Sequence, residues 1–282
     1  MSLANALTID VEDYFQVTAF ERHIDRAQWD GIPLRVVDNT LRTLDLLDRF
    51  QLKGTFFTLG WVAERCPQLA PQIVARGHEI ACHGYGHELV YQIGPERFRS
   101  DIRRAKAIIE DQCGVRVHGY RAPSYSITNR SLWALDILVE EGFSYDSSIF
   151  PVRHDTYGIP GAERFPHTIE TQAGPLKEFP LTTLPISIGW KKLSLPIAGG
   201  GYLRLLPVEL IRYGMARINT REHQPAVLYF HPWEIDPGQP RIKASLKSRF
   251  RHYQNLAGTE GKLSHLFQAL KFASMRDVLG IQ

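Results

Sequence analysis

Two histidines four residues apart, in the segment His83-Gly-Tyr-Gly-His87, are the residues whose types and spacing point most directly to chemistry. A divalent metal ion needs ligand atoms about 2 Å away, and neutral imidazole nitrogens are among the ligands that zinc accepts. Side chains at positions i and i+4 lie on one face if the segment turns helically, and the glycines leave the loop free to do so. The pattern alone is common, and a pair of ordinary loop histidines is its more frequent explanation.

Acidic residues are crowded at the end of an apolar segment near the N-terminus, at Asp10, Glu12 and Asp13. Buried carboxylates this close repel one another, so a cation must compensate them unless they form a solvated turn or a helix cap. On an extended strand Asp10 and Glu12 point to the same face. Glu12 is therefore the favoured third metal ligand, with Asp10 beside a reactive water. Asp13 is the alternative ligand if the chain has already turned.

Further polar clusters follow other apolar segments. Arg121 stands just before Pro123 and would hold Asp10 ionised and oriented. His231 follows a buried apolar run and would protonate a leaving amine. Asp146 would orient His231, as a carboxylate orients an imidazole. Each residue also has a structural interpretation, as a turn arginine, a histidine that ends a strand, and a turn cap.

These clusters require a scaffold in which strand ends meet, and the hydrophobic pattern predicts one. Short apolar runs alternate with segments of helical spacing, which indicates repeated β–α units and a parallel sheet. The expected strands are 6–10, 55–59, 78–82, 143–146, 177–179, 184–188 and 226–230. The expected helices are 34–50, 67–76, 95–112, 129–141, 207–219 and 263–278. Each cluster follows a strand end, and the carboxyl ends of parallel strands are where such folds bind ligands.

The overall composition fits one folded domain and excludes several classes of protein. The 282 residues are 44% hydrophobic with a formal charge of +3, which favours a large core and argues against nucleic acid as a partner. The three cysteines form no C-x-x-C pair, so neither a disulfide framework nor a thiolate zinc site is expected. Without a signal-peptide pattern or a run of roughly 18 apolar residues, we expect a cytoplasmic protein with no transmembrane segment. The basic segment Arg241–Arg251 predicts a solvated helical face or, less often, a patch for an anionic polymer or a membrane surface.

In their order along the chain, the five clusters resemble the motifs of the polysaccharide deacetylases of the NodB-homology type, carbohydrate esterase family 4. The motifs read Thr8-Ile-Asp10-Val-Glu12-Asp13, His83-Gly-Tyr-Gly-His87, Arg121-Ala-Pro123-Ser124-Tyr125, Asp146-Ser-Ser148 and Leu228-Tyr-Phe-His231. The resemblance spans about residues 7–234. The spaced acids of the first motif are similar to an intracellular subgroup, and the ending Pro232-Trp233-Glu234 is similar to deacetylases of exopolysaccharide and exosortase systems.

The resemblance implies one α/β domain over residues 1–282, built as a distorted barrel of seven or eight β/α units. The core would span 6–236, with a long irregular insertion over 150–207 and an extension over 237–282 that ends in a helix. The implied activity is a metal-dependent removal of N-acetyl groups from a sugar or polysaccharide, in exopolysaccharide or cell-envelope biosynthesis. The implied cofactor is one divalent ion, zinc first, with cobalt, nickel or manganese as alternatives. The partner would be the N-acetylated carbohydrate, and the oligomeric state stays open, including a homo-oligomer.

The resemblance also implies a role for each site residue. The set is Asp10, Arg121, Asp146 and His231 for catalysis, Glu12, Asp13, His83 and His87 for the metal, and Tyr125, Leu228 and Trp233 for the substrate. Asp10 would be the general base and His231 the general acid. Leu228 would line the pocket for the acetyl methyl group, and an N–H near Ser124 or Tyr125 would bind the oxyanion.

Two other functions are compatible with the same motifs. One is hydrolysis of a cyclic amide, as in allantoinase-like relatives. The other is a carbohydrate-binding protein that has kept the fold and lost catalysis. Aromatic side chains available to stack on sugar rings are Tyr85, Tyr125, Trp190 and Trp233, although such residues more often simply pack in a core.

Overall fold

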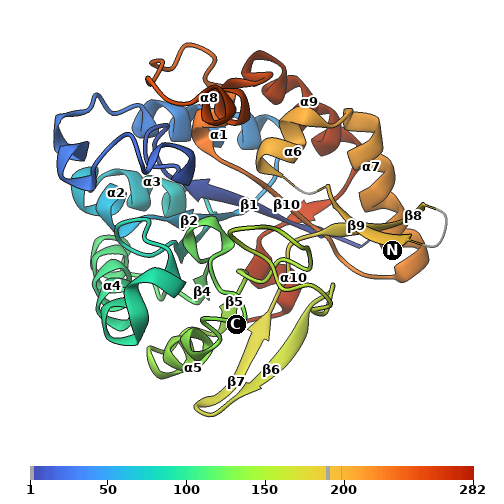
Figure 1. The fold of residues 1–282 in the computed structure, drawn as a ribbon, viewed down its shortest axis with the longest axis horizontal. Helices are drawn as coiled ribbons and strands as arrows, with labels where there is room; N and C mark the ends of the chain where they lie inside the picture. Colours follow the sequence, from blue (N-terminus) through green and yellow to red (C-terminus); the bar gives the residue numbers. More distant parts are fainter. Residues whose placement is uncertain (1–2, 189–190, 198) are drawn as a thin grey trace.

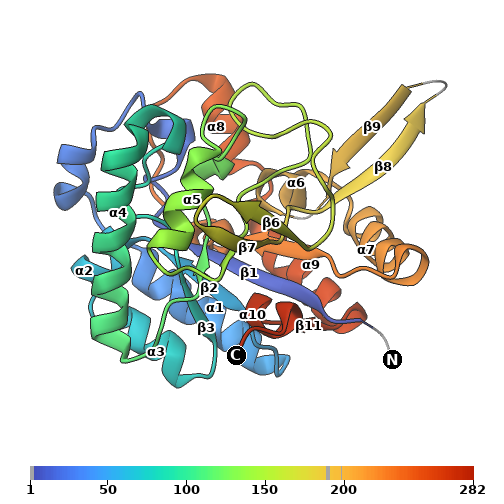
Figure 2. The same cartoon turned by 90° about the horizontal axis from the view of Figure 1, so that it is seen from below.

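A mostly parallel β-sheet lies at the centre of the molecule, with helices around it (Figure 1). The computed structural model describes residues 3–188, 191–197 and 199–282. The strand order is β10–β1–β2–β3–β4–β5–β7–β6, and β11 pairs with the start of β1. The strands are β1 (Asn5–Val11), β2 (Thr55–Thr58), β3 (Glu79–Cys82), β4 (Gly119–Tyr120), β5 (Tyr145–Asp146), β6 (His167–Thr171), β7 (Gly174–Glu178), β10 (Val227–Phe230) and β11 (Phe272–Ala273). A separate antiparallel pair, β8 (Thr183–Ile188) and β9 (Lys191–Pro196), extends away from the body (Figure 2).

The helices connect successive strands and cover the outer face of the sheet. They are α1 (Val36–Arg49), α2 (Gly60–Arg65), α3 (Leu69–Ala75), α4 (Val90–Cys113), α5 (Trp133–Glu140), α6 (Gly200–Leu205), α7 (Val208–Arg217), α8 (Leu246–Tyr253), α9 (Leu256–Ala269) and α10 (Met275–Leu279). Gly94 interrupts α4 with a φ of 74°, so the regular part begins at Pro95, where the sequence predicts it. Gly114, in the left-handed conformation, ends the same helix.

Alternation of side chains along the strands produces two buried layers. Every residue of β1 is buried, as expected for a central strand of a parallel sheet. Leu7 and Ile9 pack toward the helices, whereas Ala6 belongs to an inner layer with Phe57 and Tyr229. Side chains of the inner face meet across the strands that lie between them. Arg121, just after β4, contacts Asp10 on β1, although β2 and β3 lie between these two strands in the sheet. The sheet therefore curls around its inner layer.

Strand β10 lies at one edge of the sheet, and β7 is the last strand of its parallel part before the edge strand β6. In the described residues β10 and β7 share no ladder, and the space is filled by the segment that follows β7. The N–H of Val227 donates to Thr182 Oγ1 at 2.6 Å, and Gly199 forms an isolated parallel bridge with Tyr229. The expected α/β fold with a parallel sheet is confirmed, and among the described residues no strand pairing closes the sheet into a barrel at this seam.

The C-terminal segment differs from the expected single helix over 263–278. It contains α9, the short strand β11 and α10. Phe272 and Ala273 pair with the start of β1, and Ser274 caps α10 by accepting a hydrogen bond from the N–H of Asp277 at 3.1 Å. The N–H of Met275 donates to Thr55 Oγ1 at 2.7 Å, so α10 lies against the end of the sheet opposite the site. No helix within the described ranges is long and apolar enough to cross a membrane.

Candidate active site

Three potential metal ligands converge at the carboxyl ends of β1 and β3. Glu12, His83 and His87 are buried, and one ligand atom from each lies within 4.8 Å of the others. His87 Nε2 is 2.9 Å from Glu12 Oε2. His83 Nδ1 lies 2.8 Å from the carbonyl oxygen of Arg121, so that nitrogen donates its proton there and Nε2 is free to act as a ligand.

The loop between the two histidines is shaped by backbone conformation and not by a helical turn. Gly84 has a φ of +72°, and a Cβ at this position would lie 2.9 Å from Asp101 Oδ2. The Asp101 carboxylate accepts hydrogen bonds from the next two backbone N–H groups, at 2.7 and 3.3 Å. Arg26 donates to the carbonyl oxygens of Gly86 and His87, at 2.7 and 2.9 Å. These contacts bring His87 back toward His83.

Asp10 and Arg121 form a buried ion pair beside the three ligands. Arg121 Nη1 lies 2.7 Å from Asp10 Oδ1 and 2.8 Å from Thr8 Oγ1. The rest of the guanidinium donates to the carbonyl and hydroxyl oxygens of Ser147, at 3.2 and 3.0 Å. Burial opposes the charge, but the Asp10 carboxylate raises the pKa of Arg121 above its ordinary value. Arg121 therefore orients one oxygen of Asp10 and leaves the other facing the site.

His231, at the end of β10, lies on the opposite side of the same cluster. Its Nε2 is 3.9 Å from Asp10 Oδ2 and 3.6 Å from Glu12 Oε1. Burial disfavours the charged imidazole, but Glu12, Glu234 and Asp10 together raise the pKa of His231 to about 9. The imidazole is thus protonated at neutral pH and is placed to donate a proton.

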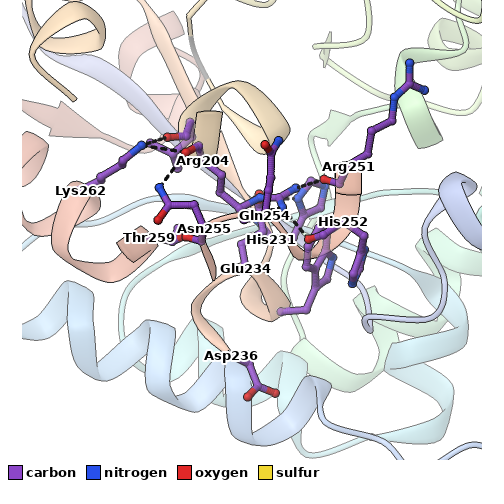
Figure 3. A network of polar contacts seen from close by, with 12 residues as sticks. Arg204, His231, Glu234, Asp236, Arg251, His252, Gln254, Asn255, Thr259 and Lys262 are labelled. Atoms are coloured by element: carbon purple, nitrogen blue, oxygen red, sulfur yellow. Dashed lines mark hydrogen bonds and ion pairs between the residues drawn. The ribbon is translucent and has the colours of Figure 1, made fainter. Parts of the chain in front are cut away.

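Glu234, not Asp146, is the carboxylate that orients His231. Glu234 Oε2 lies 2.9 Å from His231 Nδ1 and also accepts from the His231 backbone N–H at 2.9 Å. Its other oxygen accepts from Arg204 Nε at 2.6 Å. Arg204 further donates to the backbone carbonyls of Arg251, His252 and Gln254, as Figure 3 shows. Sequence analysis missed Glu234 and Arg204, although the three-residue spacing from His231 to Glu234 is that of a helix-capping pair.

Asp146 belongs to a different buried network. Its carboxylate accepts a hydrogen bond from Ser148 Oγ at 2.5 Å. Burial raises the pKa of Asp146 to about 6, and burial together with Asp146 raises the pKa of Glu178 well above its ordinary range. The Asp146–Glu178 pair therefore lies where β5 and β7 are neighbours in the sheet. It is next to Ser147, which Arg121 contacts. The expectation that Asp146 contacts His231 is corrected.

Asp13 is a structural residue. One carboxylate oxygen accepts from the N–H of Tyr14 at 2.8 Å, and the other accepts from the N–H groups of Arg35 and Val36 at 2.8 and 3.0 Å. The N–H groups at the start of α1 have no partner within the helix, so Asp13 takes the role of a helix cap. Of the two acids left open by the sequence, the structure brings Glu12 to the histidines and directs Asp13 away from them.

Comparison with known proteins supports the same assignment of family. Residues 28–138 match the family model described as polysaccharide deacetylase, and residues 147–280 match a domain of unknown function, DUF3473. Over residues 28–138 the chain is thus similar to the polysaccharide deacetylases. It is 36% identical over 110 residues to a peptidoglycan deacetylase-like protein of Gibberella zeae, covering 38% of this chain and 32% of that protein. It is 30% identical over 108 residues to the peptidoglycan deacetylase of Helicobacter pylori, covering 38% of this chain and 36% of that protein. The match thus spans about a third of each relative's length.

Solved structures of similar fold extend the likeness along the chain. A putative polysaccharide deacetylase from Mycobacterium smegmatis has a TM-score of 0.64 and 23% identity, covering 99% of this chain and 89% of that one. A probable polysaccharide deacetylase from Pseudomonas aeruginosa has a TM-score of 0.62 and 16% identity, covering 98% and 89%. At these identities the comparison shows that this chain shares their fold.

In this chain the expected substrate residues are placed differently from the sequence expectation. Leu228 is fully buried in the helix-facing layer, on the opposite face of β10 from His231. The inner-facing neighbour is Tyr229, whose ring packs against that of Tyr125 at 5.2 Å between centroids. Leu228 is therefore removed from the proposed acetyl pocket, because residues 228 and 231 alternate to opposite faces. Tyr125 is largely enclosed, with an exposed fraction of 7%.

The other aromatic candidates also have protein partners. Trp233 donates from Nε1 to Glu12 Oε1 at 3.3 Å, and its ring is stacked between those of His231 and His252. It therefore positions the proposed ligand Glu12. Tyr85 carries the guanidinium of Arg104 over its ring. Trp190 lies outside the described residues.

The two N–H groups proposed for oxyanion binding differ in their partners. The N–H of Tyr125 donates to the carbonyl oxygen of Ala122 at 3.0 Å and is thus occupied. Ser124 has a φ of +51°, and no acceptor for its N–H is found within the described part of the chain. Ser124 is therefore the better candidate.

Proposed function

We propose that this chain is a metal-dependent N-deacetylase that acts on an N-acetylated sugar or polysaccharide. The observation that carries the proposal is the convergence of Glu12, His83 and His87. A carboxylate held by an arginine and a protonated imidazole flank this cluster, at Asp10 and His231. This combination supplies a base, an acid and a cation site within one set of strand ends.

The donor set fits a divalent ion. Glu12 Oε2 is buried without a hydrogen-bond partner among the described residues, although His87 Nε2 lies close to it. Burial alone would favour the neutral acid, but the surrounding imidazoles lower the pKa of Glu12 to about 2. Burial lowers the pKa of His83 to about 4. At neutral pH these two groups are in the forms that bind metals, and two histidines with one glutamate are the ligands of several catalytic zinc sites.

A divalent ion held by these residues would polarise the acetamide carbonyl and acidify an attacking water. The free oxygen of Asp10, oriented through Arg121, is placed to accept a proton from an attacking water. The N–H of Ser124 is the candidate donor to the oxygen on which negative charge develops. His231 then protonates the departing nitrogen, and the products are acetate and a free amino sugar.

The substrate class is supported by the relatives. Those similar to this chain include a peptidoglycan deacetylase of Helicobacter pylori and a chitooligosaccharide deacetylase of Sinorhizobium fredii. Both names describe removal of acetyl groups from polymers or oligomers of amino sugars. We propose a related N-acetylated glycan of exopolysaccharide or cell-envelope biosynthesis as the substrate and zinc as the first metal to test.

Acetate release from N-acetylglucosamine oligomers, measured with the metal content of the purified protein, tests the proposal. We expect release that depends on zinc, cobalt, nickel or manganese and falls about 10²–10⁴-fold in Asp10→Asn, the range for loss of a general base. Asp45→Asn, on the exposed side of α1, is the matched control. Ring opening of allantoin without acetate release would instead favour a cyclic amidase. Glycan binding with neither metal nor turnover would indicate a non-catalytic homologue.

A further inference from the structure

Helix α8 exposes an apolar ridge on the molecular surface. Leu246 is 82% exposed and Phe250 is 63% exposed, the highest values among large apolar side chains in the described ranges. They are four residues apart, so they lie next to each other on one face of the helix. Exposing two such side chains to water is unfavourable, which suggests that this face contacts something apolar.

The ridge is surrounded by basic residues. Arg241, Lys243, Lys247, Arg249 and Arg251 are all exposed, and residues 237–254 contain no aspartate or glutamate. None of the five forms an ion pair with a carboxylate within the described chain. On the helix, Lys247 and Arg251 lie along one side of the ridge and Arg249 along the other. The positive charge therefore remains available to an anionic partner.

The helix is firmly attached to the site. His252, on its opposite face, is stacked on Trp233 with ring centroids 4.1 Å apart, and Phe20 packs against His252 at 4.7 Å. Arg204 binds the backbone carbonyls at the end of α8 and, through Glu234, the imidazole of His231. Figure 3 shows the side chain of Arg251 directed away from this network. The exposed face thus stands on a rigid base beside the proposed active site.

We propose that α8 docks the protein on an anionic lipid bilayer, with Leu246 and Phe250 entering the headgroup region and the basic residues contacting lipid phosphates. A bilayer fits better than a soluble polyanion, because two strongly exposed apolar side chains, Leu246 and Phe250, lie between the cations. Short amphipathic helices with this composition lie in the membrane interface. Docking requires no catalysis and is independent of the proposed deacetylase activity.

Co-sedimentation of the full chain with vesicles tests the proposal without any substrate. We expect binding to phosphatidylcholine vesicles that contain phosphatidylglycerol, weak binding to phosphatidylcholine alone, and loss of binding as salt is raised. The double variant Leu246→Ser with Phe250→Ser should bind at least tenfold more weakly. The double variant Lys247→Gln with Arg251→Gln should lose roughly fivefold for each cation removed.

A matched control replaces one leucine and one aromatic residue that are exposed elsewhere, Leu132→Ser with Tyr213→Ser, and should bind like the wild type. Equal binding to neutral and anionic vesicles, or no binding to either, would overturn the proposal. Binding that is lost on removal of the cations but not of the apolar pair would indicate a soluble polyanion instead. A dimer in gel filtration that Leu246→Ser with Phe250→Ser converts to a monomer, without vesicle binding, would identify the face as a contact between copies.

Discussion

The imidazole Nδ1 of His231 and a carboxylate oxygen of Glu234 lie 2.9 Å apart, and the same oxygen accepts the backbone N–H of His231. The residue that needs orientation and the residue that orients it are thus in the same turn after β10. Burial opposes the charge of Glu234, but Arg204 and His231 lower the pKa of its carboxyl to about 2. The carboxylate therefore remains ionised and fixes the Nε2 atom of His231 toward the site.

Replacing Glu234 by glutamine should reduce kcat about 10–100-fold, because partners that orient a catalytic imidazole typically have effects of this size. KM and metal content should stay unchanged, since Glu234 does not contact the three proposed ligands. Steady-state kinetics and metal analysis on the same sample measure both. Glu209→Gln, on the exposed surface of α7, is the control. A parallel loss of metal would show that Glu234 supports the ligands instead.

His83→Ala and His87→Ala should each weaken metal binding by more than about 100-fold, since even groups that only orient ligands contribute 10–100-fold. Competition with a fluorescent chelator measures the affinity. Glu12→Gln should behave in the same way. Full metal binding in Glu12→Gln would contradict the assignment of the third ligand.

Asp13→Ala separates the two acids of the first motif. Because Asp13 accepts N–H groups at the start of α1, its loss should lower the free energy of unfolding by about 1–2 kcal/mol. Metal affinity should remain that of the wild type. Urea unfolding and metal titration are the two measurements, and loss of metal without loss of stability would reverse the roles of Asp13 and Glu12.

Gly84→Ala should weaken metal binding and destabilise the protein by about 1–3 kcal/mol. The new Cβ would require a left-handed backbone and would approach the Asp101 carboxylate that holds the loop. Gly86→Ala is the matched control, because a Cβ there meets nothing closer than 3.8 Å. Similar stability and affinity of the two variants would show that the loop adapts.

The Asp146–Glu178 pair should make stability depend on pH. Both acids have a raised pKa in the folded chain, near 6 for Asp146, whereas unfolded carboxyls titrate near 4. The folded state therefore holds more protons, and stability falls as the pH rises through this interval. Glu178→Gln should raise the free energy of unfolding by on the order of 1–2 kcal/mol at pH about 8, with a smaller gain near pH 4. The exposed Glu170→Gln should show no such trend in urea unfolding at the two pH values.

Local pattern was sufficient for most strands and helices of the first half, because buried runs and helical spacing are continuous there. The convergence of the candidate ligands Glu12, His83 and His87 followed from their positions after strands. The position of Leu228 could also have been predicted. Side chains alternate along a strand, so a residue three positions before His231 points to the other face of β10. The spacing from His231 to Glu234 was likewise a usable signal.

Other parts of the site could not be predicted from local pattern. Arg204 reaches Glu234 from α6, across 30 residues of chain, and nothing in its immediate sequence indicates this contact. The expected helix over 263–278 is divided into α9, β11 and α10, because Phe272 and Ala273 pair with β1. This pairing is a tertiary contact that the local sequence does not indicate. Asp146 and Glu178 become partners only because β5 and β7 are neighbours in the sheet.

The strand β1 is paired with β2 on one side and with β10 on the other. Strand β2 lies in the segment matched by the polysaccharide deacetylase model, and β10 lies in the segment matched by DUF3473. The two proposed histidine ligands come from the first segment, and His231, Glu234 and Arg204 come from the second. Both matched regions therefore contribute side chains to one candidate active site. Recombination between the two matched regions would therefore separate the proposed acid from the proposed histidine ligands.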